Sequence, residues 1–150
     1  IDGYVFITRI LDGEYVNCEK LIPAEYKQRI FLKRQEIIDS VERVSLLIND
    51  SLSTPLRFVV KSDGAIISSI TSSGKAKENF NLELEGENFE IGLNSRYLLD
   101  ALRACDSDEL IIRFNGLNSG VVIIDRNEEN EDFLYLIMPM RMSSNAVSGN

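Results

Sequence analysis

The residues best suited to contact other molecules lie close to the C-terminus. The chain has three methionines, and all of them, Met138, Met140 and Met142, lie there at every second position. On an extended strand this spacing places them on one face, together with Leu134 and Leu136. Unbranched thioether side chains repack around different apolar guests, so the pattern fits a surface that accepts several peptides. Packing into the core is the alternative, and composition alone favours it.

Motifs for catalysis or metal binding are missing from the sequence. The chain has no histidine, which is the most frequent general base near neutral pH and the commonest metal ligand. Its two cysteines, Cys18 and Cys105, are far apart, so no C-x-x-C zinc or redox motif exists, and we expect two buried free thiols in a reducing cytosol. Neither a Walker-type loop nor a G-x-S-x-G motif is present. We therefore expect no intrinsic catalysis, no cofactor and no metal.

The acid-rich segment from Asp125 to Asp132 offers oxygen ligands at alternating positions. It fails as an EF-hand loop, because Asn130 stands where that loop needs glycine and Leu136 where it needs a bidentate glutamate. We expect a solvated hairpin loop here.

Length and composition fit one ordinary globular domain. A length of 150 residues excludes a multi-domain enzyme. A composition that is 44% hydrophobic and 27% charged excludes a disordered chain. The formal net charge is −8, so any contact with DNA must be local or topological rather than carried by bulk positive charge. No apolar run approaches the roughly 18–20 residues that cross a bilayer, and we expect a soluble, cytoplasmic protein. Because the chain begins with Ile1, we expect a fragment or processed product.

The N-terminal segment has the composition of a strand without a partner. Residues 4–10 are rich in β-branched and aromatic side chains and are followed by the turn Asp12-Gly13. Since little upstream sequence can pair with them, we expect the last strand of a preceding domain, continued by a linker as far as residue 27.

From residue 29 the hydrophobic periodicity predicts regular elements. Ile30 and Leu32 indicate a short strand, and the apolar spacing from Ile37 to Ile48 indicates a helix of roughly four turns. Three more strands are predicted at 56–61, 65–71 and 80–85, the first two joined by the hairpin signal Asp63-Gly64.

The second half of the chain repeats the first, shifted from Ile30 to Ile91. Ile37-Ile38-Asp39 corresponds at the same offset to Leu98-Leu99-Asp100. A second helix is predicted from an N-cap at Asn94 or Ser95 to about Ala104, with strands at 109–114, 120–125 and 133–138. Two units, at about 29–85 and 89–142, predict an α+β fold: a duplicated βαβββ unit with two helices packed side by side on one antiparallel sheet layer.

Three stretches resemble the bacterial DNA polymerase III beta subunit family, the beta sliding clamps. They are Ile10–Tyr15 with Leu21–Pro23, Glu90–Asn94 with Tyr97–Leu102, and Tyr135–Arg141. The resemblance covers nearly the whole chain and implies the DNA clamp fold, in rings of two head-to-tail subunits with three domains each. It implies that residues 28–142 form the C-terminal clamp domain and that residues 1–27 hold the last strand of the middle domain and the linker. Residues 143–150 extend past the usual C-terminus, and we expect a mobile tail.

The resemblance also implies a function. The family serves as the processivity factor of the replicative DNA polymerase, as a homodimer that encircles duplex DNA without sequence preference. Its partners are the polymerase, the clamp loader and repair proteins, which bind through short linear motifs, and no membrane is involved. Such a protein is a non-catalytic subunit of a DNA-directed DNA polymerase, a nucleotidyltransferase holoenzyme. The alternative is a stand-alone adaptor of clamp ancestry that binds peptides and never closes a ring; a hydrolytic enzyme is a distant third.

Three sets of candidate site residues follow from the resemblance. The implied peptide-binding cleft comprises Val16, Lys20, Leu21, Asn118, Gly120, Leu136, Ile137, Met138, Pro139, Met140, Arg141 and Met142. The implied contacts with the DNA backbone are Arg43, Arg96 and Arg103. The implied ring interface comprises Leu46, Leu47, Lys75, Lys77 and Glu78.

Each set has an alternative explanation. Arg96, Asp100 and Arg103 fall on one helical face, so part of that charge can be paired internally, and each arginine can simply belong to a solvated face. Core packing competes with an interface role for Leu46 and Leu47. Lys75 and Lys77 depart from the usually acidic segment of the family, which leaves the charge pattern of the interface open.

Overall fold

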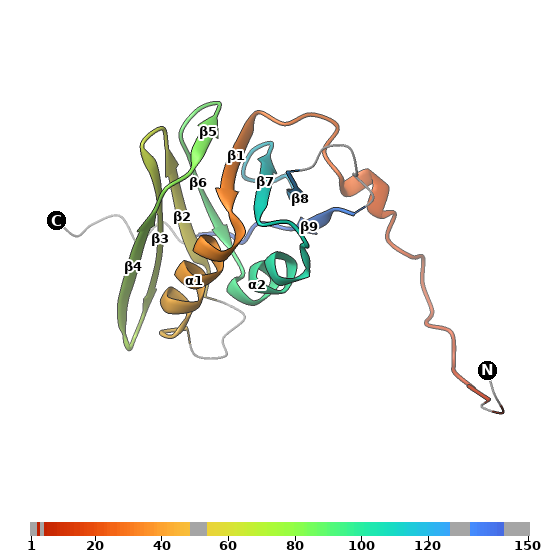
Figure 1. Ribbon diagram of the computed structural model, residues 1–150. Coiled ribbons are helices and arrows are strands. Elements are labelled where there is room, and N and C mark those ends of the chain that lie inside the picture. The colour runs from red at the N-terminus through yellow and green to blue at the C-terminus, as the bar shows by residue number, and fades with distance from the viewer. Residues whose placement is uncertain (1–2, 4, 49–53, 127–132, 143–150) are drawn as a thin grey trace.

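The computed structural model describes residue 3 and residues 5–48, 54–126 and 133–142 (Figure 1). Most of the predicted acidic loop and all of the predicted tail at 143–150 lie outside these residues. A short 3-10 helix, η1 (Cys18–Leu21), precedes the regular elements, which are β1 (Gln28–Lys33), α1 (Arg34–Ser45), β2 (Leu56–Lys61), β3 (Gly64–Thr71), β4 (Gly74–Phe80), β5 (Glu83–Glu85), β6 (Phe89–Leu93), α2 (Ser95–Ala104), β7 (Glu109–Phe114), β8 (Val121–Asp125) and β9 (Tyr135–Ile137).

The strands form two antiparallel sheets, and the two repeated units exchange their first strands. One sheet has the order β5-β1-β7-β8-β9 and the other the order β4-β3-β2-β6. Strand β1 of the first unit pairs with β7 of the second, and β6 of the second pairs with β2 of the first. Neither unit can therefore complete its sheet alone. The duplicated α+β architecture is confirmed, but the expected single layer is divided into two sheets, joined at one side by an isolated bridge between Gly92 and Met140.

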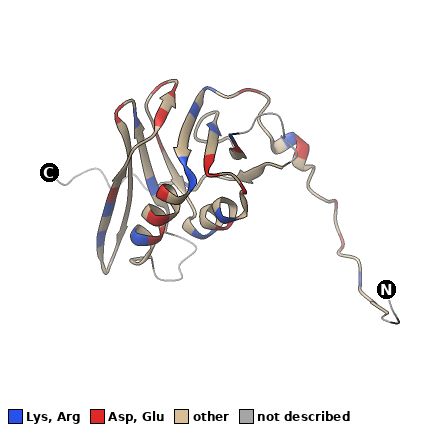
Figure 2. Ribbon diagram, viewed as in Figure 1, with Lys and Arg blue, Asp and Glu red and all other residues tan. Residues whose placement is uncertain are grey.

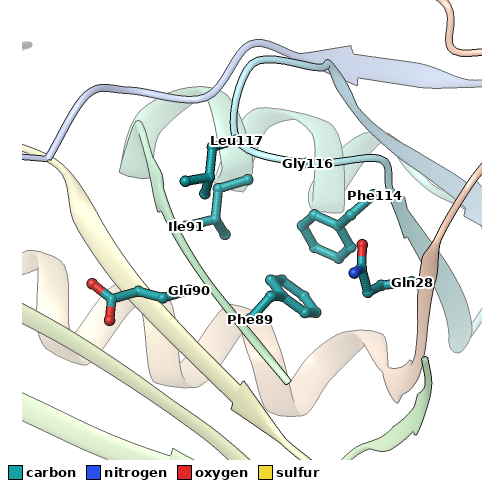
Figure 3. A pocket seen from close by; sticks show the side chains of 7 residues that line it. All are labelled: Gln28, Phe89, Glu90, Ile91, Phe114, Gly116 and Leu117. Carbon is teal, nitrogen blue, oxygen red and sulfur yellow. The ribbon is translucent and has the colours of Figure 1, made fainter. Parts of the chain in front are cut away.

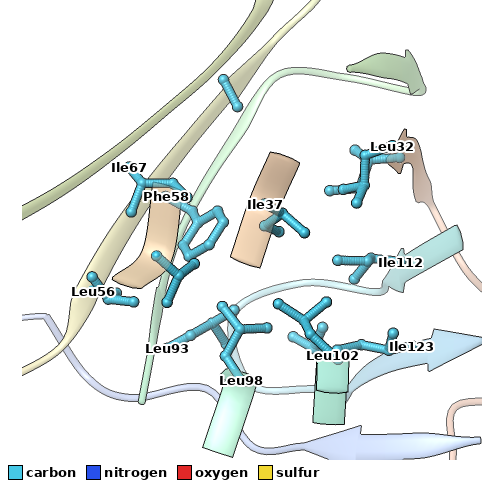
Figure 4. Close-up of a cluster of buried hydrophobic side chains, with 14 of the residues drawn as sticks. Leu32, Ile37, Leu56, Phe58, Ile67, Leu93, Leu98, Leu102, Ile112 and Ile123 are labelled. Atoms are coloured by element: carbon cyan, nitrogen blue, oxygen red, sulfur yellow. The ribbon is translucent and has the colours of Figure 1, made fainter. Parts of the chain in front are cut away.

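Both helices lie side by side on one face of the sheet layer, and the main core fills the space between the helices and the sheets (Figures 1 and 4). Strands β2 and β3 alternate buried and less buried residues, as expected for sheets with one covered face. The apolar positions that repeat between the units are buried in both: Ile37 and Leu98, Val41 and Leu102, and Val44 and Cys105, the last of which caps the end of α2. The repeat therefore preserves the side chains that hold the helices on the sheets.

The two helices begin and end close to the predicted positions, and a side-chain cap explains where α2 begins. The Asn94 side chain accepts a hydrogen bond from the Tyr97 amide at 3.1 Å, which satisfies one of the free N–H groups of the first turn. The predicted N-cap and the end of the helix at Ala104 are thus confirmed. Helix α1 begins at Arg34, before Ile37, and ends at Ser45 rather than at Ile48, although the Ile48 amide still bonds to the Ser45 carbonyl at 2.9 Å and Ile48 packs against the core.

Two strand predictions were wrong in extent. The strand expected from a preceding domain stays a prediction, because described residues 5–10 pair with no strand edge here and their apolar side chains, such as Phe6, are exposed. The predicted strand at 80–85 is broken after Phe80, since β4 pairs with β3 in one sheet whereas β5 pairs with β1 in the other. The last strand is limited to β9, because Pro139 has no amide to continue the ladder.

Candidate functional site

The C-terminal segment, residues 135–142, crosses from one sheet to the other. Its first part is β9, at the edge of the five-stranded sheet, and the Met140 amide then donates to the Gly92 carbonyl of β6 at 2.8 Å. Ile137 is buried in the core, whereas Met138 is 51% exposed and Met140 and Met142 are half-buried. The methionines therefore lie at the surface and are not sealed in the core.

Two glycines make room for this segment. A Cβ atom at Gly92 would lie 2.8 Å from Cγ of Met142 and 2.9 Å from the Met140 carbonyl oxygen. A Cβ atom at Gly120 would overlap Cδ1 of Leu136. Gly120, a predicted cleft residue, thus acts by letting Leu136 lie flat against the start of β8.

A hollow of about 480 Å³ lies between α2 and β9, and we call it the α2–β9 hollow. It is lined by Tyr97, Asp100, Ala101 and residues 134–137. Two predicted cleft residues, Leu136 and Ile137, are therefore brought to one cavity, next to helix residues that the sequence did not indicate as site residues. Tyr97 could have been found, because it is an exposed aromatic residue that lies outside the buried stripe of Leu98 and Leu102.

The outer face of the five-stranded sheet carries a second apolar cluster. Ile111, Val122 and Ile124 are buried there, with Tyr26, Phe31 and Leu136 packed against them. Because side chains alternate along β9, Leu136 joins this outer cluster while its neighbours Tyr135 and Ile137 face the core. The end of the linker, at Tyr26, thus lies on the same surface as Leu136.

Four predicted cleft residues from the linker and the β7–β8 loop are exposed and lie outside the lining of the hollow. Val16 precedes η1, and Lys20 lies within it. The Asn17 side chain caps this helix by accepting a hydrogen bond from the Lys20 amide at 3.4 Å. Leu21 ends that helix, and Asn118 lies in the loop between β7 and β8. Cys18, predicted to be buried, is exposed, because η1 contributes no buried residue.

The predicted DNA-facing arginines differ in their surroundings. Arg43 Nε lies 3.1 Å from Glu78 Oε1, and the hydrogen bond to Glu78 raises the pKa of Arg43. Arg103 Nη2 lies 2.7 Å from Glu42 Oε1. Arg96 is exposed and makes no ion pair with any residue that the structure describes. Figure 2 shows both signs of charge along α1 and α2, so the helices present a mixed surface.

The residues of the predicted ring interface lie at one end of the four-stranded sheet. Leu46 is 82% exposed, which excludes core packing, whereas Leu47 lies beside Gly74 at the β3–β4 turn. Lys75 and Lys77 are exposed on β4, the edge strand of this sheet. Lysines on an edge strand also hinder unwanted pairing, which is their alternative role.

A second cavity, of about 290 Å³, opens between the sheets at β1, β6 and β7 (Figure 3). The rings of Phe89 and Phe114 line it at a centroid distance of 4.4 Å. Glu90 points away from these rings in Figure 3, and both of its oxygens accept hydrogen bonds from Arg57, at 2.6 and 2.7 Å, which lower the pKa of Glu90. The cavity therefore offers apolar contacts and no free carboxylate.

The described residues form no cluster of metal ligands, and their buried thiol is not poised to react. Among them, no group of three or more Cys, Asp or Glu residues could hold a metal ion. Burial, and then the charge of Asp125, raise the pKa of the Cys105 thiol to about 11, so it stays protonated near neutral pH. No helix in the described part of the chain has the length and apolar character needed to cross a membrane.

Comparison with known proteins decides the family. Residues 19–141 match the family model for the C-terminal domain of the DNA polymerase III beta subunit. The chain belongs to this family. It is 28% identical over 138 residues to the beta sliding clamp of Staphylococcus epidermidis, a match that covers 91% of this chain and 36% of that protein. The same identity and coverage hold for the beta sliding clamp of Staphylococcus aureus.

Solved beta subunits share the fold. The structure from Pseudomonas aeruginosa superposes with a TM-score of 0.80 at 26% identity, over 88% of this chain and 36% of that chain. The Thermotoga maritima structure gives a TM-score of 0.81 at 22% identity, over 90% of this chain and 36% of that chain. The predicted DNA clamp fold is thereby confirmed. The chain spans about a third of the length of these relatives.

Proposed function

We propose that the chain is the C-terminal part of a sliding clamp, the processivity factor of a replicative DNA polymerase. The match of residues 19–141 to the beta subunit family carries this proposal. In it, residues 28–142 are the C-terminal clamp domain, and residues 1–27 are the last strand of the middle domain with the linker. The exposed apolar side chains of residues 5–11 support this division, since a strand of another domain would leave them without their partners here.

The proposed assembly is a ring homodimer that holds duplex DNA by encirclement. A ring needs no strong attraction, so a net charge of −8 is compatible with DNA as a sequence-independent partner. The proposed contacts with DNA phosphates come from Arg43, Arg96 and Arg103. They should be weak, because Arg43 and Arg103 are already engaged in ion pairs within the domain. Weak contacts permit sliding.

The ring contact is proposed at Leu46, Leu47, Lys75, Lys77 and Glu78. An exposed leucine next to an edge strand supports it, because both features can be covered by a neighbouring subunit. The charges differ from the usual family pattern, so a partner surface that faces the two lysines should carry acidic residues.

Partner proteins are proposed to dock along the C-terminal segment and the linker. The cleft comprises Val16, Lys20, Leu21, Asn118, Gly120 and residues 136–142. The exposure of Met138 and the position of Leu136 and Ile137 at the α2–β9 hollow support this placement. The partners are the replicative polymerase, the clamp loader and repair proteins, each through a short linear motif. The protein itself would act in the cytoplasm as a non-catalytic subunit of a DNA-directed DNA polymerase holoenzyme.

Peptide binding tests the proposed cleft directly. Short overlapping peptides that tile the replicative polymerase of the same organism are titrated against the chain by fluorescence anisotropy. We expect at least one peptide to bind, and Met138→Ala and Met140→Ala each to weaken it by about fivefold or more. The control is Ile70→Ala, since Ile70 is also an exposed apolar residue but lies on β3 of the other sheet. Undiminished binding in both methionine variants would contradict the proposed cleft.

A further inference from the structure

The α2–β9 hollow arises because the two repeated units end differently. In the first unit, β4 runs for seven residues beside α1, and Glu78 of this strand pairs with Arg43 of the helix. In the second unit, β9 has three residues. The shorter strand leaves the face of α2 that carries Tyr97 and Asp100 open beside residues 134–137.

Most of the hollow is apolar. Ala101 and Ile137 are buried beneath it, and residues 134–137 form its other wall, although the Leu136 side chain packs into the cluster on the outer face of the sheet. The Tyr135 hydroxyl donates to the Ala104 carbonyl at 2.8 Å, so this group is already used by the domain itself. The hollow can therefore accept an apolar side chain of a partner.

Asp100 is the charged residue of the lining, and its carboxylate is exposed. Within the described residues, it makes no hydrogen bond or ion pair. Two arginines flank it on α2: Arg103 is held by Glu42 at 2.7 Å, and Arg96 forms no ion pair with it. The hollow thus combines an apolar floor with a carboxylate at its rim that no described side chain pairs with.

We infer that Asp100 selects partner peptides that carry a lysine or arginine beside the apolar residue that enters the α2–β9 hollow. The inference rests on the proposed function, since it specifies which peptides the clamp prefers. Charge complementarity is the reason: a cation next to the hollow can pair with Asp100, whereas an acidic residue there is repelled. The net charge of −8 adds to the same preference at longer range.

The chain supplies a matched control for this test. Asp39 of α1 is the counterpart of Asp100 in the first repeat, and it accepts a hydrogen bond from Gln35 Nε2 at 2.7 Å. Asp39→Asn removes the same charge from an equivalent helix position that does not line the hollow. It therefore measures the general effect of net charge alone.

The experiment is a positional scan of the polymerase peptide that binds the chain. Each residue outside its apolar anchors is replaced in turn by Lys, Gln or Glu, and dissociation constants are measured for the unmodified chain, Asp100→Asn, Asp100→Lys and Asp39→Asn. At one position we expect the unmodified chain to prefer Lys over Gln by about two- to fivefold, the range for partly exposed ion pairs. This preference should vanish in Asp100→Asn, turn towards Glu in Asp100→Lys, and persist in Asp39→Asn.

Two failures can be told apart. If no polymerase peptide binds the unmodified chain, the proposed function fails. If a peptide binds and Met138→Ala weakens it, but no position shows a Lys preference that depends on Asp100, the inference about Asp100 is wrong while the cleft stands. Circular dichroism of each variant separates loss of binding from loss of folding.

Discussion

Arg103 and Glu42 form an ion pair between residues that occupy equivalent positions in the two repeated units. The Arg103 Nη2 and Glu42 Oε1 atoms lie 2.7 Å apart, and the sequence separation of 61 residues is the offset of the repeat. The pair therefore lies where α1 and α2 face each other across the pseudo-symmetric centre of the domain. The two equivalent positions carry opposite charges, so the contact between the helices at this point is attractive.

This relationship predicts a small stabilisation. Both side chains are about half exposed, at 56% and 47%, so the pair should contribute only about 0.2–1 kcal/mol to the free energy of unfolding. A double-mutant cycle with Glu42→Gln and Arg103→Gln in urea denaturation measures this coupling. Raising the salt concentration should reduce it. A coupling above about 2 kcal/mol would show that the pair is far less screened than its exposure implies.

A larger side chain at Gly120 should disturb the packing of the proposed cleft. Gly120→Ala would press a methyl group into Leu136, and we expect about 1–3 kcal/mol of destabilisation together with weaker peptide binding. In Gly120→Ala with Leu136→Ala, the overlap is removed, so the two changes should cost less than the sum of their separate effects. Additive costs in chemical denaturation would argue against this contact.

The two cysteines should differ in reactivity. Cys18 is exposed, whereas Cys105 is buried with its pKa raised to about 11, so iodoacetamide should label only Cys18 in the folded protein near pH 8. Mass spectrometry of tryptic peptides identifies the labelled site. Unfolding in urea should make Cys105 react as well. Rapid labelling of Cys105 without denaturant would contradict its burial.

The same thiol links stability to pH. In the unfolded chain it loses its proton near its ordinary pKa of 9.0, but in the folded chain only near 11. Between these values, the unfolded state binds fewer protons, so the stability contribution of this group falls as pH rises from about 9 to 11. Cys105→Ala should remove that part of the alkaline loss seen in denaturation midpoints. An unchanged pH profile would mean that the folded and unfolded thiols titrate alike.

The isolated chain should bind duplex DNA weakly. Without a closed ring, we expect an affinity no tighter than the roughly 10⁻⁴–10⁻⁶ M of ordinary non-specific complexes at physiological salt. Arg96→Ala should weaken the residual binding more than Arg103→Ala, because Arg103 is engaged by Glu42. Fluorescence titration of a labelled duplex at several salt concentrations measures both effects. A tight, sequence-selective complex would contradict retention by encirclement.

The sequence by itself determined the elements of the repeated unit. Apolar spacing specified α1 and α2, because a helix on a sheet must bury one stripe, and the same stripe recurs at Ile37 and Leu98. The Asn94 cap was equally local, since an N-cap contacts only the first turn of its own helix. The methionine pattern was compatible with a binding surface at the C-terminal segment, but composition alone favoured core packing, and the resemblance to the beta sliding clamps decided between the two.

Only the tertiary structure decided how these elements combine. The exchange of β1 and β6 between the units joins residues far apart in the chain, and periodicity carries no information about strand partners. Residues 5–10 have the composition of a strand but form none, because a strand needs an edge to pair with. The α2–β9 hollow and the free carboxylate of Asp100 depend on a difference in strand length between units, which appears only when both units are packed together.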